Sequence, residues 1–340
     1  MKFLRAMASG LAVGCALAGT ATMVSAQDVT LRYSNWLPAG FGVTEHVIKP
    51  WIADVERVTE GRVKVEMLPK PVGTVLGQYD VVADGLADMS LIVPSYTAGR
   101  FPVFEGLEQA FIGDDMSKRS PASWKAFETF IQPTGETSEV HVVGVFSSNA
   151  AHVATTKKKV QTVADFQGLK LRTPGPAMTA GLENLGAVPV SKPMSEVYEL
   201  AAGGVIDGGV FPVDVLKSFR LEGVIKQMTL VPGGLGATHM LVAMNKSAWN
   251  RISDADRKAI LEVSGAAMAE RAGAAMHKVD LDERAFATSA NIALEDASPE
   301  LAAAIKEKIL PVRQAWIAKA KEAGLPDPAQ MLDFLEAQSR

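Results

Sequence analysis

The chain has 340 residues, of which 48% are hydrophobic and 21% charged, and its formal net charge at pH 7 is −4. This composition is typical of an ordered globular protein and excludes a disordered chain. The charge is small, negative and spread without blocks, so the sequence offers no basic surface for nucleic acid or for an anionic membrane. A chain of this length can form two domains, each with its own core.

Residues 1–26 have the pattern of a secretory signal peptide. Lys2 and Arg5 precede an apolar run that ends near Val24, and "VSA" stands before Gln27 as an A-x-A-like cleavage site. Two alternatives stay open. The run could be an uncleaved membrane anchor, because it is nearly long enough to span a bilayer, or Cys15 could carry a lipid. Small residues dominate the run and "AVGC" lacks the leucine expected before a lipidated cysteine, so we expect cleavage after Ala26.

From Val29 onward, short apolar strands alternate with helical segments. Residues 29–37 are predicted to form the first strand, a helix follows with apolar residues on one face between Val47 and Val58, and "RVKVEML" is the next strand. This alternation indicates an α/β protein with mostly parallel sheets. Cys15 is the only cysteine, so the exported chain would have no disulfide and no thiolate metal site.

Two segments repeat one another. "YDVVADGLADMSLIV" (79–93) and "YELAAGGVIDGGVF" (198–211) both place a glycine six residues after the tyrosine and an aspartate three residues later. In each, a helix is predicted to end at the glycine, and an apolar strand then runs into a proline. We infer two domains of similar architecture, with equivalent strand-end loops at 94–96 and 211–214.

The segment "DFQGLKLRTPG" (165–175) predicts a short apolar strand with Arg172 near its end. Pro174 and Gly175 break the strand there, so Arg172 is expected to project beyond the edge of the sheet. Ligands of open α/β sheets bind at this edge.

A long run without proline begins at Ser253, which starts a Ser-x-x-Asp cap. If the helix continues unbroken to about Ala287, it is roughly 50 Å long. That length would span two small domains and fix their relative geometry.

Catalytic signatures are missing from the sequence. It has no Gly-x-Ser-x-Gly elbow, no His-Glu-x-x-His and no P-loop, and "GGLGATH" lacks the third glycine of a dinucleotide fingerprint. The five histidines do not have the spacing of metal ligands. An exported two-domain chain of this kind is expected to bind a ligand, with no metal and no cofactor.

Six segments in this order resemble the solute-binding proteins of tripartite ATP-independent periplasmic (TRAP) transporters. They are "RYSNWLPAG", "DVERVTEGRVKVEMLPKP", "VVADGLADMSL", "DFQGLKLRTPG", "GGVIDGG" and "MLVAMNKSAWNRISDADRKAI". The resemblance implies the two-domain periplasmic binding protein fold, with a ligand cleft between the domains and a long helix shared by both. It also implies capture of a small organic acid and its delivery to the small and large membrane subunits of the transporter.

Arg172 lies where this family places its carboxylate-binding arginine, whose planar fork of donors fits a carboxylate. The other candidate ligand contacts are strand-end residues and residues at the domain crossings. They are Trp36, Phe41 and Tyr96 from the first domain, Phe211 and Pro212 from the second, and Asn149, His152 and His239 at the crossings. The aromatic members predict a ligand with an apolar or aromatic body behind its acid group.

The expected division places residues 27–150 and 238–275 in the first domain and residues 151–237 and 276–340 in the second. The protein is expected in the periplasm, as a monomer or a homodimer. Two other functions stay open. The chain could be an exported enzyme that acts on an acidic substrate with His152 or His239 as general base, or it could present its ligand to a membrane sensor.

Overall fold

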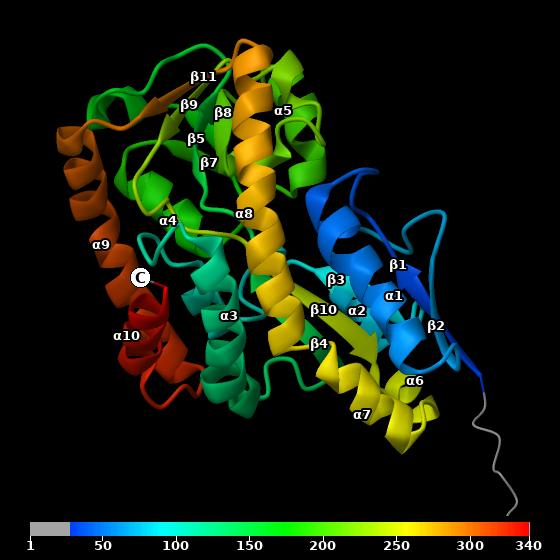
Figure 1. Cartoon of the computed structure of the whole chain (residues 1–340). Coiled ribbons are helices and arrows are strands. Elements are labelled where there is room, and N and C mark those ends of the chain that lie inside the picture. The colour runs from blue at the N-terminus through cyan, green and yellow to red at the C-terminus, as the bar shows by residue number, and fades with distance from the viewer. Residues whose placement is uncertain (1–27, 340) are drawn as a thin grey trace, which may run out of the picture.

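Two α/β lobes lie side by side in the computed structural model, which describes residues 28–339 (Figure 1). Each lobe is built on one sheet covered by helices, and helix α8 (Ala266–Ser289) runs along both. The predicted signal peptide, 1–26, lies outside the described residues. Across residues 28–339, no helix is both long enough and apolar enough to cross a membrane.

The sheet of the first lobe has the strand order β2-β1-β3-β10-β4. Its strands are β1 (Val29–Ser34), β2 (Val63–Met67), β3 (Met89–Ile92), β4 (Val140–Ser147) and β10 (His239–Asn245). β1 pairs in parallel with β2 and β3, whereas β10 is antiparallel to β3 and to β4. The first strand is shorter than the predicted 29–37, because the chain turns away after Ser34.

The sheet of the second lobe has the order β11-β9-β5-β8-β6-β7. Its strands are β5 (His152–Thr155), β6 (Lys170–Thr173), β7 (Val188–Ser191), β8 (Gly208–Phe211), β9 (Gln227–Leu230) and β11 (Ala293–Asp296). β5 is antiparallel to both of its neighbours, and the other pairings are parallel.

The chain crosses between the lobes in two places. It leaves the first sheet after Ser147 and enters the second at His152, and it returns between Leu230 and His239. A strand that enters its sheet from the cleft runs against strands that end at the cleft, which explains why β5 and β10 are the antiparallel members. Both sheets are therefore mixed, and the expectation of mostly parallel sheets has to be corrected at these two strands.

The repeated segments form equivalent structures in the two lobes. Each short helix, α2 (Gln78–Ala83) or α5 (Val197–Ala202), is followed by a glycine with positive φ, 72° at Gly85 and 69° at Gly204. The aspartate three residues later accepts a hydrogen bond from the backbone of the neighbouring parallel strand. Asp88 accepts from Arg32 N at 2.8 Å, and Asp207 accepts from Lys170 N at 2.9 Å. The motif thus fixes the register of two adjacent strands whose ends face the cleft.

The predicted long helix is broken. It divides into α7 (Asp254–Glu262) and α8, and Gly265 between them has φ 53°. A Cβ atom at Gly265 would lie 2.6 Å from the ring of Trp124, so the close approach to α3 (Met116–Ala126) selects glycine and a turn there. The 24 residues of α8 still extend about 36 Å, enough to contact β4 in one lobe and β11 in the other.

The C-terminal part of the chain also touches both lobes. α9 (Pro299–Glu322) packs Ile305 and Ile309 on the second lobe, while Trp316 lies in the core of the first and donates from Nε1 to Pro102 O at 2.9 Å. α10 (Pro328–Gln338) packs against α3. The chain beyond about Trp316 therefore belongs with the first lobe, which differs from the expected assignment of 276–340 to the second.

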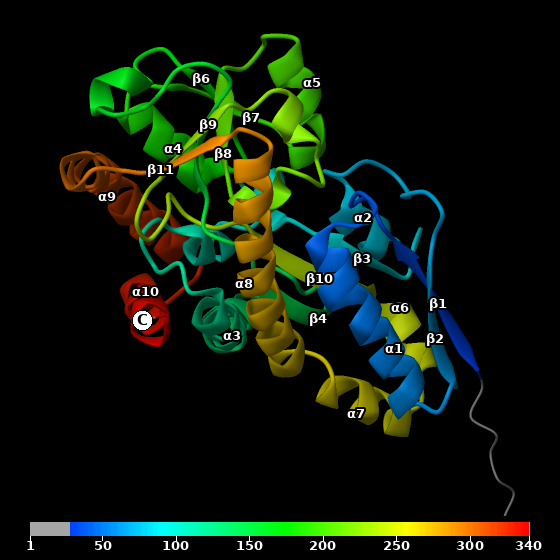
Figure 2. The same cartoon turned by 45° about the horizontal axis from the view of Figure 1, so that its top comes forward.

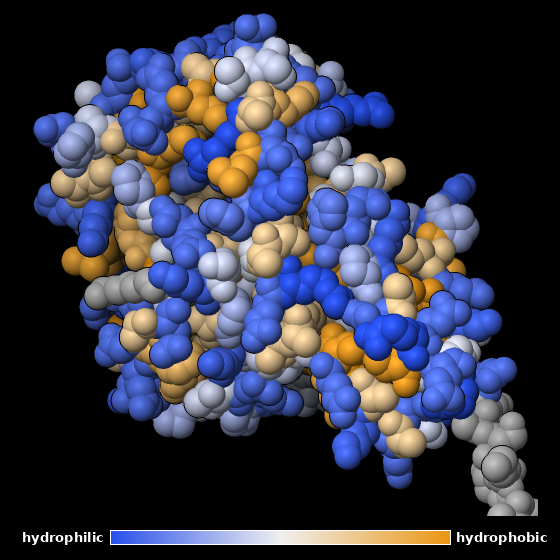
Figure 3. All heavy atoms as spheres, in the orientation of Figure 1, coloured by the Kyte–Doolittle hydropathy of each residue, from blue (hydrophilic) through white to orange (hydrophobic). Residues whose placement is uncertain are grey.

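The largest buried apolar cluster contains residues of both sheets together with Met268 and Met276 of α8. Figure 2 shows α8 passing in front of both lobes, with α4 (Pro176–Asn184) on the second lobe and α3 on the first. On the face seen in Figure 3, hydrophilic side chains are interspersed with patches of hydrophobic ones. The remaining helices are α1 (Lys49–Val58) and α6 (Lys246–Arg251).

Candidate functional site

A cavity of about 470 Å³ lies between the lobes, at the ends of the strands that face the cleft. Arg172 of β6 lines it together with residues from the loops that follow β1, β3 and β8. The sequence-predicted residues that it contains are Trp36, Phe41, Tyr96, Arg172, Phe211 and Pro212. The structure thus brings together candidates that are far apart in the sequence. The cavity is also lined by residues that the sequence analysis did not single out.

The side chain of Arg172 is only 2% exposed. Its Nε donates to Lys192 O at 2.7 Å, its Nη1 to Val210 O at 3.4 Å and its Nη2 to the hydroxyl of Tyr96 at 3.4 Å. Burial lowers the pKa of the guanidinium, while the Tyr96 hydroxyl and the Glu108 carboxyl act in the opposite direction. Among residues 28–339, Arg172 forms no salt bridge.

A buried cation without a counter-ion is costly unless a bound anion supplies the missing partner. The backbone carbonyl at Lys192 fixes Nε, so the guanidinium is held in one orientation before any ligand arrives. A carboxylate is the anion that best matches this planar donor fork.

Tyr96 and Trp36 form the wall contributed by the first lobe. Their rings are 6.2 Å apart between centroids, and Trp36 Nε1 donates to Leu91 O at 2.8 Å. The Tyr96 hydroxyl accepts from Met194 N at 3.1 Å in addition to its contact with Arg172. Since Met194 and Arg172 belong to the second lobe, Tyr96 connects the two lobes beside the cavity.

Phenylalanine side chains close the other side. Phe41 of the first lobe meets Phe219 of the second edge to face, with ring centroids 5.5 Å apart. Phe211, at the end of β8, is 1% exposed and lines the same cavity. The rings leave a narrow apolar space in front of Arg172, and such a space fits a flat apolar group better than a polyhydroxylated one.

Asn149, His152 and His239 do not line this cavity, contrary to what was expected of them. The Asn149 amide donates to Asp214 Oδ2 at 3.0 Å and to Met276 O at 2.9 Å, on the side of α8. His152 Nδ1 accepts from Val231 N at 3.1 Å, and burial lowers the pKa of its imidazole to about 4. These bonds hold the first crossing against the returning chain and against α8.

His239 is fully buried inside the first lobe. Its Nδ1 donates to Ala237 O at 3.1 Å, its Nε2 lies 2.8 Å from Ser123 Oγ, and burial lowers the pKa of the imidazole well below its ordinary value. Both ring nitrogens are occupied by the protein, so the side chain stabilises the start of β10.

Several cavity residues were missed by the sequence reasoning. They are Leu37, Val93, Ser148, Met194, Asp214, Val215, Phe219, Thr238 and Met240. Val93 directly precedes the first predicted strand-end loop, and Asp214 is the last residue of the second, so the repeat could have indicated both. Phe219 could not be indicated by the repeat, because it lies in the turn after the second loop. In the folded protein its ring packs against Phe41 of the first lobe.

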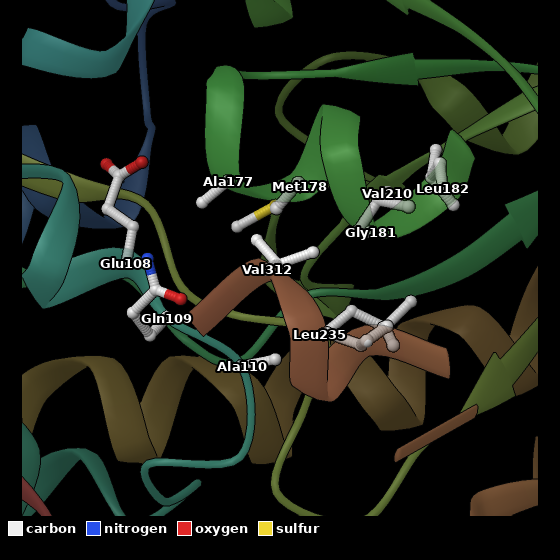
Figure 4. Close-up of a pocket in the computed structure, with 11 residues that line it drawn as sticks. Glu108, Gln109, Ala110, Ala177, Met178, Gly181, Leu182, Val210, Leu235 and Val312 are labelled. Carbon is white, nitrogen blue, oxygen red and sulfur yellow. The ribbon is translucent and has the colours of Figure 1, made fainter. Parts of the chain in front are cut away.

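A second, narrower space of about 320 Å³ lies between the lobes near α4 and α9 (Figure 4). Most of its lining is apolar, with Met178, Leu182 and Val312 among the side chains, and the Glu108 carboxylate points away from them. Glu108 Oε1 accepts from His239 N at 3.0 Å. The residues that line this space include no arginine, lysine or histidine, so it lacks the cation expected of an acid-binding site.

A wider cavity of about 900 Å³ opens between the first crossing and α8. Its lining mixes signs, and Arg284 is already paired with Asp280, with Nε 2.6 Å from Oδ2. Within the described part of the chain, no group of three or more histidine, cysteine or acidic side chains could hold a metal ion. The cavity at Arg172 is therefore the candidate ligand site.

Comparison with known proteins agrees with this architecture. Residues 34–320 match the family described as bacterial extracellular solute-binding protein, family 7. A TRAP solute-binding protein of Bordetella bronchiseptica, solved with bound (R)- and (S)-mandelate, is 34% identical. The similarity covers 92% of this chain and 98% of that one, with a TM-score of 0.88.

Two further solved structures are similar over the same share of this chain. A marine metagenome protein described as specific for aromatic acid ligands, solved with 3-hydroxybenzoate, is 30% identical over 92% of this chain and 98% of its own, with a TM-score of 0.86. A protein of Rhodoferax ferrireducens, solved with copurified benzoate, is 27% identical over 92% and 97%, also with a TM-score of 0.86. These likenesses confirm the predicted fold class.

Proposed function

Since the chain belongs to family 7 of the bacterial extracellular solute-binding proteins, we propose that its solute is an aromatic monocarboxylic acid whose carboxylate is held by Arg172. The resemblance to TRAP solute-binding proteins is confirmed, and the chain is a solute receptor of this transport system and not an enzyme. The observation that carries the proposal is the buried, preoriented and unpaired guanidinium at one side of an aromatic cavity.

The aromatic part of the proposal is supported by the rings of Trp36, Tyr96, Phe41, Phe211 and Phe219 around the cavity. Aromatic side chains bury a large area with little rotamer entropy and leave few hydrogen-bonding groups for a sugar acid. The ligands of the three similar structures are mandelate, 3-hydroxybenzoate and benzoate. Each combines one carboxylate with one ring.

Binding would couple to closure of the lobes. Tyr96 reaches Met194 and Arg172 across the cleft, and Phe41 meets Phe219, so the walls of the site are complete only when the lobes are together. A ligand that bridges both walls favours the closed state by its differential affinity for that state.

The family acts outside the cytoplasm and works with membrane permease subunits. We propose that residues 1–26 direct export and are cleaved after Ala26. The intact mass of protein recovered from the periplasm tests this assignment, because an uncleaved or lipidated chain is heavier.

The test of the site is Arg172→Ala, with Arg172→Lys as the conservative variant. Loss of one partner of a desolvated ion pair costs about 2–5 kcal/mol, so affinity for benzoate or mandelate should fall about thirty-fold to several thousand-fold. Lysine keeps the charge without the fork and should restore only part of the affinity. Isothermal titration calorimetry measures both.

Lys170→Ala is the matched control, since it removes a positive charge from an exposed position on the same strand. It should leave affinity unchanged. Affinity of Arg172→Ala within about threefold of the parent would remove Arg172 from the site. Binding of sugar acids or small dicarboxylates, with no binding of aromatic acids, would contradict the choice of ligand class.

A further inference from the structure

A second ionisable side chain lines the cavity of Arg172. Asp214, in the turn after β8, is 1% exposed. Its Oδ2 accepts from the Asn149 amide at 3.0 Å, whereas its Oδ1 has no hydrogen-bond partner among the described residues. A buried polar atom without a partner is costly, so a ligand group that reached Oδ1 from the cavity would remove that cost.

The protein cannot satisfy Oδ1 by a small rearrangement of Asn149. The second hydrogen of the Asn149 amide is already donated to Met276 O of α8 at 2.9 Å. The amide is thus anchored between the helix and Oδ2, and both of its hydrogens are used.

The electrostatic surroundings of Asp214 favour a neutral carboxyl. Burial raises the pKa of Asp214 to about 7, and the like charges of Asp280 and Glu283 on α8 act in the same direction, whereas the Asn149 amide and the backbone N–H of Asp214 itself act against it. Since Oδ2 accepts from Asn149, a proton on the carboxyl would reside on Oδ1. Asp214 Oδ1 can therefore donate a hydrogen bond when neutral and accept one when ionised.

We propose that Asp214 binds a hydroxyl group of the ligand, so that the protein prefers hydroxylated aromatic acids to their deoxy analogues. The inference rests on the proposed function and adds a second polar contact to it. A hydroxyl both donates and accepts, so it complements either form of the carboxyl. A second carboxylate on the ligand would be repelled, and an ammonium would find only one free acceptor for its three donors.

The first experiment needs no variant. Calorimetry compares mandelate with phenylacetate, and 3-hydroxybenzoate with benzoate, on the parent protein. At least one hydroxylated acid should bind about tenfold or more tightly than its deoxy partner, because the deoxy acid leaves Oδ1 buried and unpaired. Equal affinity within both pairs would overturn the inference, and so would tighter binding of phenylglycine, the amine analogue, than of mandelate.

The second experiment replaces the carboxyl by an apolar side chain of similar size. In Asp214→Leu the preference for the hydroxylated acid should disappear, through loss of affinity for that acid, while the deoxy acid keeps its affinity within about threefold. Glu199→Leu, an exposed carboxylate of α5 in the same lobe, is the control and should keep the preference. Thermal melting verifies that each variant folds. If Asp214→Leu does not fold, the comparison of hydroxylated and deoxy acids on the parent protein tests the inference.

The outcomes separate this inference from the proposed function. If aromatic acids bind through Arg172 but the hydroxyl makes no difference, the proposed function stands and the role of Asp214 falls. If the hydroxyl preference survives in Asp214→Leu, another group recognises the hydroxyl and Asp214 is excluded. If no aromatic acid binds, both proposals fall together.

Discussion

Buried ionisable side chains gather where the two lobes meet, and each has a different balance of partners. Among the described residues, Arg172 is oriented by backbone carbonyls and forms no salt bridge, while Asp214 has a hydrogen-bond partner at Oδ2 and none at Oδ1. Glu108 is as deeply buried as both, but it lies outside the cavity of Arg172 and accepts a hydrogen bond from His239 N at 3.0 Å. The effect of the Glu108 carboxyl on the stability of the fold can therefore be tested without ligand.

We predict that Glu108→Gln stabilises the protein at pH 8 and has little effect near pH 4.5. Burial raises the pKa of Glu108 to about 7, with Glu105 acting in the same direction and His239 N, Ser95 and Arg119 against it. In the unfolded chain the pKa of a glutamate is about 4.3, so the raised pKa in the folded state contributes fully to stability only below that pH. This contribution is lost as the pH rises from about 4.3 to about 7. Glutamine stays neutral throughout.

The measurement is the melting temperature of parent and Glu108→Gln between pH 4.5 and pH 8, without ligand. The difference should grow through this range and level off above pH 7. Glu183→Gln, an exposed carboxylate on α4, serves as the control and should show no such growth. A difference that is the same at every pH would mean that Glu108 is already ionised in the folded protein at pH 4.5.

At the scale of elements, α8 is the part that both lobes share, and glycine allows it to lie close to α3. A Cβ atom at Gly273 would lie 2.4 Å from Met116 O, a backbone atom that cannot rotate away. We predict that Gly273→Val destabilises the protein by about 1–3 kcal/mol or more, the cost of overpacking a close contact. Urea unfolding measures the change.

Ala274→Val is the matched control, because Ala274 is the next residue of the same helix and is exposed. Valine has a lower helix propensity than alanine by no more than about 0.7 kcal/mol. If the two variants lost equal stability, helix propensity and not the contact with α3 would explain the effect at Gly273.

The elements that could be predicted from the sequence are those set by local chemistry. The repeated Gly-x-x-Asp turns depend on a glycine with positive φ and on an aspartate that reaches the next strand, and both are visible in the sequence. The break at Gly265 could not be predicted in this way. It depends on Trp124, which lies far away in the chain and comes close only in the folded protein.

The same distinction applies to the site. Arg172, Tyr96 and Phe211 stand at or just beyond strand ends, and the carboxyl ends of parallel strands face the cleft, so their place could be predicted. His152 and His239 begin the crossing strands, where a side chain can face either the cleft or the interior. Hydrogen bonds with Val231 N and Ala237 O hold these side chains outside the cavity of Arg172, and no local pattern in the sequence reveals that choice.

At the scale of the whole molecule, the two lobes are joined by the two chain crossings and also by helices α8 and α9. They touch across the cleft as well. One of these contacts is made by Gly175, after β6, and Ser95, after β3. A Cβ atom at Gly175 would lie 2.5 Å from Ser95 Cβ and 2.7 Å from Ser95 O. The backbone there is extended, with φ −172°, so alanine itself is not strained at this position.

We predict that Gly175→Ala holds the lobes apart while leaving each lobe intact. The added methyl group meets the other lobe only when the cleft is closed, so the closed state becomes less favourable and the open state is unaffected. Affinity for an aromatic acid should fall about tenfold or more, which is about 1.4 kcal/mol of closure energy. Small-angle scattering should show less contraction on addition of ligand than in the parent.

Gly181→Ala is the control for this variant, since its Cβ would make an ordinary contact of 3.5 Å with Ile309 of α9. Both changes add one methyl group to the second lobe, but only the methyl at Gly175 faces Ser95 of the first. If Gly175→Ala bound ligand and contracted as the parent does, the lobes would accommodate the methyl group without separating. Closure would then not require the Ser95–Gly175 contact, and the cleft walls at Tyr96 and Phe41 alone would define the closed state.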